Sequence, residues 1–256
     1  PTLARMIAQK QAQLPRPIRW WSFGPFWRYE RPQKGRTREF FQWNIDLLGL
    51  DDPRADAELL AVAAGFFREV GLGAGEVVLQ VNNRRLMDGC LARIGIDGEA
   101  KKSAFRLIDK RDKLAPPAWA AYAGTLGFSA EQVAALSTLL EDRELWRESA
   151  ELSTLFDLLE AYGVRKLIEY EPSVIRGLDY YTGTVFEARD REGEFRAILG
   201  GGRYDNLVAD VGGDPLPGVG FAMGDVVVGL VLEKYGRLPA TRPAPARVLV
   251  TLFGAE

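Results

Sequence analysis

The stretch RGLDYYTGTVFE, residues 176–187, places an arginine, an aspartate and two tyrosines on a turn that leads into an apolar strand. A second stretch, LGGGRYDNL at residues 199–207, sets three consecutive glycines ahead of further polar side chains. Consecutive glycines weaken a strand and are usually kept where another group approaches the backbone closely. The ordinary structural role open to Asp205 is to cap a helix that begins at Asn206. Together the two stretches predict polar side chains at the rim of a rigid sheet.

Alternating and helical patterns around these stretches predict the rest of the fold. Strands are expected at 18–23, 41–48, 76–81, 166–170, 184–189, 195–199 and 218–222. Helices are expected at 52–70, throughout 83–162, with a start at Ser129 and stops at Gly127 and Gly163, and at 225–235. Runs of strands with interrupted helices, without regular strand–helix alternation, predict an α+β fold: an antiparallel β-sheet flanked by helices.

The same patterns divide the chain into parts. Residues 1–82 and 163–236 form the predicted sheet-containing core, and residues 83–162 form a helical insertion. Residues 237–246, rich in proline and alanine, are the predicted linker. A strand pattern then begins, so residues 247–256 are expected to start a further domain.

Composition excludes several kinds of protein. With 256 residues, of which 47% are hydrophobic, the chain can bury a sizeable core. The 33 basic and 35 acidic residues leave a net charge of -2, so RNA contacts must come from local patches and not from an overall basic field. A single cysteine, Cys90, excludes a disulfide framework and is typical of the cytoplasm. No apolar run is long enough to predict a membrane span.

The chain contains no histidine. This excludes imidazole acid–base chemistry, Ser–His and Cys–His nucleophile pairs and most zinc sites, and no metal site is predicted. An enzyme of this composition is expected to work mainly through binding and electrostatics.

A basic hairpin is predicted at residues 28–40, RYERPQKGRTREF. Its loop carries four cationic side chains, Arg31, Lys34, Arg36 and Arg38, between strands rich in aromatic residues. Guanidinium groups bind phosphate oxygens in a bidentate way and an aromatic ring stacks on a purine, so a rigid loop of this kind suits a polyphosphate ligand. The alternative is a charged loop that is only solvated.

The strand after this loop carries a polar pair. Phe40, Gln42 and Asp46 share one of its faces, because side chains alternate along a strand. Polar groups are costly to bury without partners. The pair Gln42 and Asp46 therefore predicts a binding role if that face is enclosed.

These segments are similar to signature segments of the histidyl-tRNA synthetases, a family of class II aminoacyl-tRNA synthetases. The hairpin resembles the second signature of that class. The resemblance assigns Arg28 to the α-phosphate of ATP, Glu30 to the adenine amino group and Phe40 to the adenine ring. Arg36 and Arg38 would complete the ATP-binding set.

The resemblance also implies a histidine pocket. It places six side chains around the amino acid: Arg28, Gln42, Asp46, Arg176, Tyr180 and Tyr181. Arg176 would bridge the substrate carboxylate and the α-phosphate. A neutral imidazole has one donor and one acceptor nitrogen, so Asp46 would accept from it and Tyr181 would donate to it. The alternative is that Arg176 pairs with Asp179 at the surface while the tyrosines lie in the core.

The function implied is ATP-dependent ligation of L-histidine to its tRNA through a histidyl-adenylate, with Mg2+ on the pyrophosphate. A cytoplasmic homodimer is the implied assembly. The histidine carboxylate is already ionised at neutral pH, so the first step needs no side-chain base. The helical insertion is expected to contact tRNA and to leave adenylate formation alone.

The chain departs from the class in its third signature. Class II synthetases generally carry an arginine three residues beyond the final glycine, where it packs on adenine and reaches the γ-phosphate, and this chain has Val227 there. Either Arg36 or Arg38 supplies that charge, or ATP binding is impaired. The first signature, which builds the dimer interface, is missing, so we expect an incomplete chain that also lacks most of the anticodon-binding domain.

Two other interpretations remain open. One is a synthetase-like, histidine-binding regulatory subunit of ATP phosphoribosyltransferase without aminoacylation activity, which Val227 favours. The complete turn at residues 176–181, the basic hairpin and the strand pattern from residue 247 disfavour it. The other is a degenerate synthetase-like domain in a larger regulatory protein.

Overall fold

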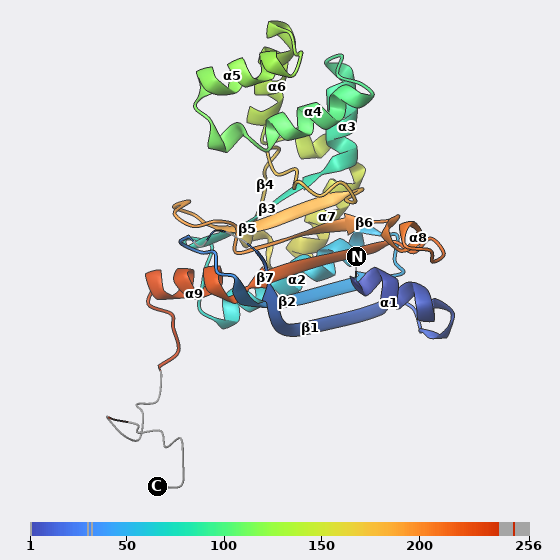
Figure 1. The fold of residues 1–256 in the computed structure, drawn as a ribbon, viewed down its shortest axis with the longest axis vertical. Helices are drawn as coiled ribbons and strands as arrows, with labels where there is room; N and C mark the ends of the chain where they lie inside the picture. The colour runs from blue at the N-terminus through green and yellow to red at the C-terminus, as the bar shows by residue number, and fades with distance from the viewer. Residues whose placement is uncertain (1, 30, 32, 241–247, 249–256) are drawn as a thin grey trace.

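A computed structural model describes residues 2–29, 31, 33–240 and 248 (Figure 1). Glu30, most of the predicted linker and nearly all of residues 247–256 lie outside the described residues. No prediction on those positions is tested by the fold.

Seven strands of the described chain form one sheet in the order β1-β2-β7-β6-β5-β3-β4 (Figure 1). Their bounds are Ile18–Trp27 (β1), Glu39–Leu48 (β2), Val77–Asn83 (β3), Ile168–Tyr170 (β4), Thr184–Asp190 (β5), Leu199–Tyr204 (β6) and Gly218–Gly224 (β7). Neighbouring strands are antiparallel except β3 and β4, which run parallel. The predicted α+β fold is confirmed, with this one parallel pair as a departure from an antiparallel sheet.

Helices α2, α3, α6 and α7 begin at side-chain caps that the sequence supplies. Asp52 accepts from the Arg54 backbone N–H ahead of α2, and Ser129 and Gln132 form a capping box at α6. The α-helical bounds are Thr2–Lys10 (α1), Pro53–Glu69 (α2), Arg84–Arg93 (α3), Glu99–Ile108 (α4), Pro116–Thr125 (α5), Ala130–Glu141 (α6), Ala150–Ala161 (α7), Leu207–Asp210 (α8) and Asp225–Lys234 (α9). Short 3-10 turns lie at Gln11–Gln13, Arg111–Lys113, Leu145–Glu148 and Arg165–Leu167. The sequence patterns above predict no element for residues 2–10.

The main core lies between the sheet and two helices. Leu60 and Phe67 of α2 and Leu155 of α7 are buried in one cluster with Phe186 of β5 and with Val219 of β7. Helices α3 to α6 project from the sheet as an arm, whereas α7 returns to pack against α2 (Figure 1). The boundaries of the helical insertion, residues 83 and 162, stay a prediction. Helix α7 falls within those boundaries but packs with α2 against the sheet.

The position of β6 corrects the prediction of a strand at 195–199, because β6 is the glycine-rich segment itself. Its partners β5 and β7 lie on both sides, so a full ladder outweighs the low strand propensity of glycine. Asp205 does not take the capping role that is open to it. Its carboxylate instead accepts from Arg85 and from the Thr182 hydroxyl, at 2.7 Å each, and α8 begins without a side-chain cap.

Candidate functional site

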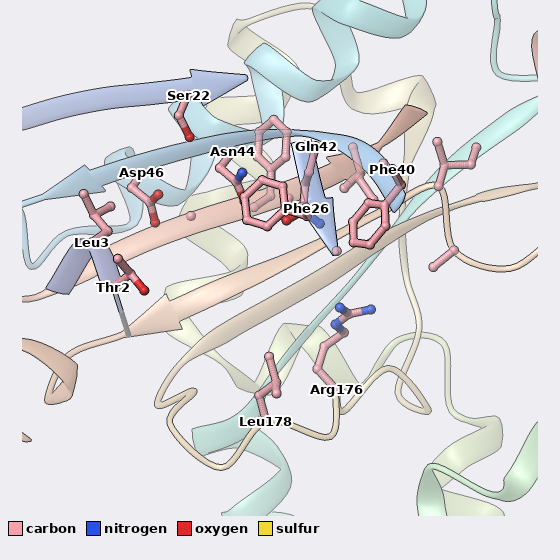
Figure 2. A pocket seen from close by; sticks show the side chains of 18 of the residues that line it. Thr2, Leu3, Ser22, Phe26, Phe40, Gln42, Asn44, Asp46, Arg176 and Leu178 are labelled. Carbon is pink, nitrogen blue, oxygen red and sulfur yellow. The ribbon is translucent and has the colours of Figure 1, made fainter. Parts of the chain in front are cut away.

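A cavity of about 930 Å³ lies over the face of β2, β6 and β7 that is opposite α2 (Figure 2). Phe40, Gln42, Asn44 and Asp46 line it from one face of β2, as strand alternation predicts, whereas Trp43 and Ile45 face the core. The cavity brings together most of the described site candidates: Arg28, Arg36, Phe40, Gln42, Asp46, Arg176, Tyr180 and Tyr181. Arg38 does not line it, and its guanidinium carbon lies instead 5.7 Å from the ring centre of Tyr29.

One end of the cavity is built around Asp46. The Tyr204 hydroxyl donates to the Asp46 carboxylate at 2.5 Å. Burial raises the pKa of Asp46, and the hydrogen bond from Tyr204 opposes that rise. Burial also raises the pKa values of Tyr180 and Tyr181, so both hydroxyls stay protonated near neutral pH. This end therefore offers one strong acceptor surrounded by hydroxyl groups.

Arg176 reaches the cavity from the opposite wall (Figure 2). Its backbone has φ 56°, in the left-handed region, which costs a non-glycine residue roughly 1–2 kcal/mol. Its Nη1 donates to Glu187 Oε2 at 3.0 Å, and its buried Nε has no hydrogen-bond partner among the described residues. The alternative pairing with Asp179 is wrong, because the partner is Glu187 on β5.

Two glycines make room for these side chains. A Cβ at Gly200 would collide with the Arg176 guanidinium, and a Cβ at Gly220 would collide with the Asp46 carboxylate. The group that approaches the glycine-rich strand closely is therefore a side chain of the protein itself, the guanidinium of Arg176 at Gly200. At Gly200 and Gly220 the cavity is lined by backbone without a side chain, and this leaves space for Arg176 and Asp46.

The hairpin forms the other end. The Arg28 guanidinium carbon lies 4.7 Å from the ring centre of Phe40, and Phe26 stacks on the same ring at 6.0 Å. A Cβ at Gly35 would lie 3.5 Å from Cγ2 of Val227, so the tip of the loop lies next to that residue. Rigid aromatic strands thus hold cationic side chains at the cavity mouth, as the sequence predicts.

Two cavity residues were missed as site candidates. Tyr204 shares a strand face with Gly200, but only the pairing of β6 with β7 places it beside Asp46. Arg196 is exposed in the loop before β6 and lines the cavity together with Val227. No sequence signal distinguishes this arginine from a solvated loop residue.

The described residues contain no cluster of metal-binding side chains. Among them, no group of three or more acidic or cysteine side chains is placed to bind an ion. Asp46 is the single acidic side chain that lines the described part of the cavity. In the same part of the chain, no helix is long and apolar enough to cross a membrane.

Comparison with known proteins identifies the family of the chain. The histidyl-tRNA synthetase family model matches residues 1–225. Curated relatives include the histidine–tRNA ligase of Halobacterium salinarum, 42% identical over 254 residues, which cover 93% of this chain and 58% of the relative. The chloroplastic/mitochondrial histidine–tRNA ligase of Arabidopsis thaliana is 36% identical over 249 residues, covering 93% and 51%.

Solved structures show the same fold. The histidyl-tRNA synthetase from Nostoc sp. PCC 7120 superposes with a TM-score of 0.81 at 26% identity, covering 96% of this chain and 61% of that one. The chain spans 58% and 51% of the lengths of the two curated relatives above. Because the family model matches this chain over residues 1–225, the chain belongs to the histidyl-tRNA synthetase family.

Proposed function

We propose that this chain carries the catalytic site of an enzyme that joins L-histidine to its tRNA through a histidyl-adenylate. One observation carries the proposal: a single cavity has the Asp46 carboxylate at one end and several guanidinium groups at the other. Histidine presents an imidazole at one end and a carboxylate at the other. ATP brings a purine and a polyphosphate.

The Asp46 end suits the imidazole. Asp46 accepts from the imidazole N–H, and the Tyr181 hydroxyl donates to the other nitrogen, because the single hydroxyl proton of Tyr204 already goes to Asp46. Gln42, on the same strand face, lies between this end and the hairpin. A site that pairs both ring nitrogens rejects apolar side chains of similar size, because they would leave its polar groups unpaired.

The hairpin end suits ATP. Arg28 faces the α-phosphate, the Phe40 ring supports the adenine, and Arg36 and Arg196 lie where the rest of the phosphate chain leaves the cavity. Glu30 stays a proposal for the adenine amino group. Magnesium would bind mainly through the phosphates of ATP, as it does in many nucleotide sites.

The chemistry follows from this arrangement. A histidine carboxylate oxygen attacks the α-phosphorus, the bond from that phosphorus to the bridging oxygen breaks, and pyrophosphate leaves. The carboxylate is already ionised, so alignment and the charges of Arg28 and Arg176 supply the catalysis. A terminal ribose hydroxyl of the tRNA then attacks the activated carbonyl and releases AMP.

Histidine-dependent ATP–pyrophosphate exchange by the intact protein tests the proposal, with other amino acids as controls. Aminoacylation of histidine tRNA tests the second step. A protein that binds histidine but neither exchanges pyrophosphate nor charges tRNA would instead support the regulatory-subunit alternative, which Val227 favours. Loss of histidine binding as well would contradict both.

We also propose a cytoplasmic homodimer that binds tRNA. Strand β1, at one edge of the sheet, exposes Trp21, Phe23 and Trp27 by 72%, 61% and 67%. Exposed apolar patches of this kind mark interaction surfaces. Sedimentation equilibrium of the intact protein tests the dimer, and a monomer at micromolar concentration would contradict it.

Arg196→Ala should raise the Michaelis constant for ATP about tenfold, near the lower limit for a hydrogen bond to a charged group. The reason is that Val227 supplies no charge beside the loop tip, whereas Arg196 is a cationic side chain that also lines the cavity. Steady-state exchange assays measure the change. Arg191→Ala is the matched control, since Arg191 lies in the same loop but pairs with Glu169 at 2.7 Å. Equal constants in the two variants would remove Arg196 from the ATP site.

Gly200→Ala should lower the turnover of exchange about tenfold, within the loss of up to about 100-fold that a displacement of 1 Å can cause. The three atoms nearest to the added methyl all belong to the flexible end of Arg176, so the guanidinium should move while the fold is kept. Gly24→Ala in β1 is the control, because nothing lies within 4 Å of its added Cβ. Turnover that matches the control would mean that the position of the guanidinium is unimportant.

A further inference from the structure

Arg84, the first residue of α3, is buried beneath the turn that carries Arg176. Its guanidinium donates to three backbone carbonyls of that turn. The acceptors are Ile175, at 3.2 Å from Nε and 3.1 Å from Nη2, Arg176, and Leu178 at 3.1 Å. The Arg84 backbone N–H also donates to the Gly183 carbonyl at 2.9 Å. Residue 84 is therefore attached on both sides of the polar turn.

These bonds fix the direction in which Arg176 points. The left-handed backbone at Arg176 is sparsely populated in unconstrained chains. Arg84 binds the carbonyl before this residue, its own carbonyl and one beyond it, so the peptide planes on both sides are held. Uncommon backbone conformations persist only where the surroundings determine them in this way.

Arg84 also contacts the helical arm. Its guanidinium carbon lies 5.1 Å from the ring centre of Phe105 on α4. The same charged group thus touches an arm helix and the active-site turn.

We propose that Arg84 is a positioning residue for Arg176, and that it links the seating of the helical arm to adenylate formation. The proposal deepens the proposed function and rests on it. Arg84 does not line the cavity, so its effect on the reaction passes through the turn.

The test is a double-mutant cycle in the intact protein. Arg84→Met keeps the apolar stem that packs near Phe105 and removes every side-chain donor, and Arg84→Lys keeps one charged donor. In the wild-type background Arg84→Met should lower the turnover of pyrophosphate exchange about tenfold or more, with both Michaelis constants within about threefold, because the loss falls on a transition-state contact. Arg84→Lys should recover part of that turnover.

In an Arg176→Ala background, Arg84→Met should lower turnover by less than about twofold, since residues that act through one another are not additive. If the double variant instead lost turnover by the product of the two single-variant factors, the proposal would be overturned. So would an Arg84→Met variant that folds and keeps wild-type turnover. Arg93→Gln is the control, because Arg93 pairs with Glu148 at the far end of the same helix at 2.6 Å.

Hydrogen–deuterium exchange separates this proposal from the proposed function. Arg84→Met and Arg84→Lys should speed exchange of the amides at residues 175–182 and leave those of β6 and β7 unchanged, whether or not the protein has activity. If the wild-type protein showed no histidine-dependent ATP–pyrophosphate exchange, that result would contradict the proposed function alone. Unchanged protection of residues 175–182 in both variants would contradict the role of Arg84.

Discussion

Arg176→Lys is expected to lower the turnover of adenylate formation by about 100-fold or more, the loss typical of removing one oriented electrostatic donor. Its Michaelis constants should change by no more than about threefold, because a contact made mainly in the transition state appears in turnover. The lysine keeps one charge near Glu187 but loses the planar fork. One ammonium cannot contact the α-phosphate and the histidine carboxylate in the same geometry.

The structure supplies a matched control for this change. Arg189 also pairs with Glu187, through its Nε at 2.5 Å, but does not line the cavity. Arg189→Lys therefore alters the same ion-pair network away from the reacting groups and should leave turnover nearly unchanged. Steady-state exchange assays decide the outcome. Normal turnover in Arg176→Lys with only a raised histidine constant would make Arg176 a substrate-binding residue.

Asp46→Asn should weaken histidine binding by about 1.5–3 kcal/mol, the value of a hydrogen bond to a charged group. Asparagine keeps the shape of the side chain and still accepts from Tyr204, but the negative charge that faces the imidazole N–H is lost. Isothermal titration calorimetry measures the affinity. Unchanged affinity would place Asp46 outside the histidine pocket.

The same substitution should stabilise the protein at neutral pH. The pKa of Asp46 is raised in the folded state, chiefly by burial, so between the unfolded and folded pKa values the native state holds more protons. Stability therefore falls as pH rises through that window, and the ionised group is a cost above it. The neutral asparagine side chain would remove this cost, so the melting temperature should rise at pH 7.5 and change less near pH 4, about where an unperturbed Asp titrates.

Tyr204→Phe is the companion variant for this prediction. It keeps the ring but removes the hydrogen bond that lowers the pKa of Asp46, so that pKa should rise further. The pH at which histidine affinity falls on acidification should rise with it. A melting temperature of Asp46→Asn that drops at pH 7.5 would show that the carboxylate stabilises the fold.

The sequence predicts the parts of the site that lie on one strand or one turn. Strand alternation places Gln42 and Asp46 on a common face, and the run from Arg176 to Tyr181 is contiguous. Tyr204 was missed because its role depends on which strand lies beside β2, and this is a property of the sheet order. No local pattern carries that information.

Two other features of the structure, the role of Arg84 and the strand formed by the β6 glycines, also differ from what the sequence predicts. Arg84 looks in sequence like an ordinary first residue of a helix, because its partners are backbone carbonyls that every sequence possesses. The glycines of β6 lower strand propensity, yet a ladder on each side keeps the segment extended. Tertiary contacts decide both features.

Asp46 and Tyr204, bonded at the polar end of the cavity, are separated by 158 residues along the chain. At about 5–20 residues per second, the ribosome delivers Tyr204 roughly 8 to 32 s after Asp46. During that interval the β1–β2 hairpin has no β7 to pair with, and its apolar side chains await the rest of the sheet. A polypeptide stalled before residue 218 therefore lacks the strand β7, which pairs with β2 and lines the binding cavity.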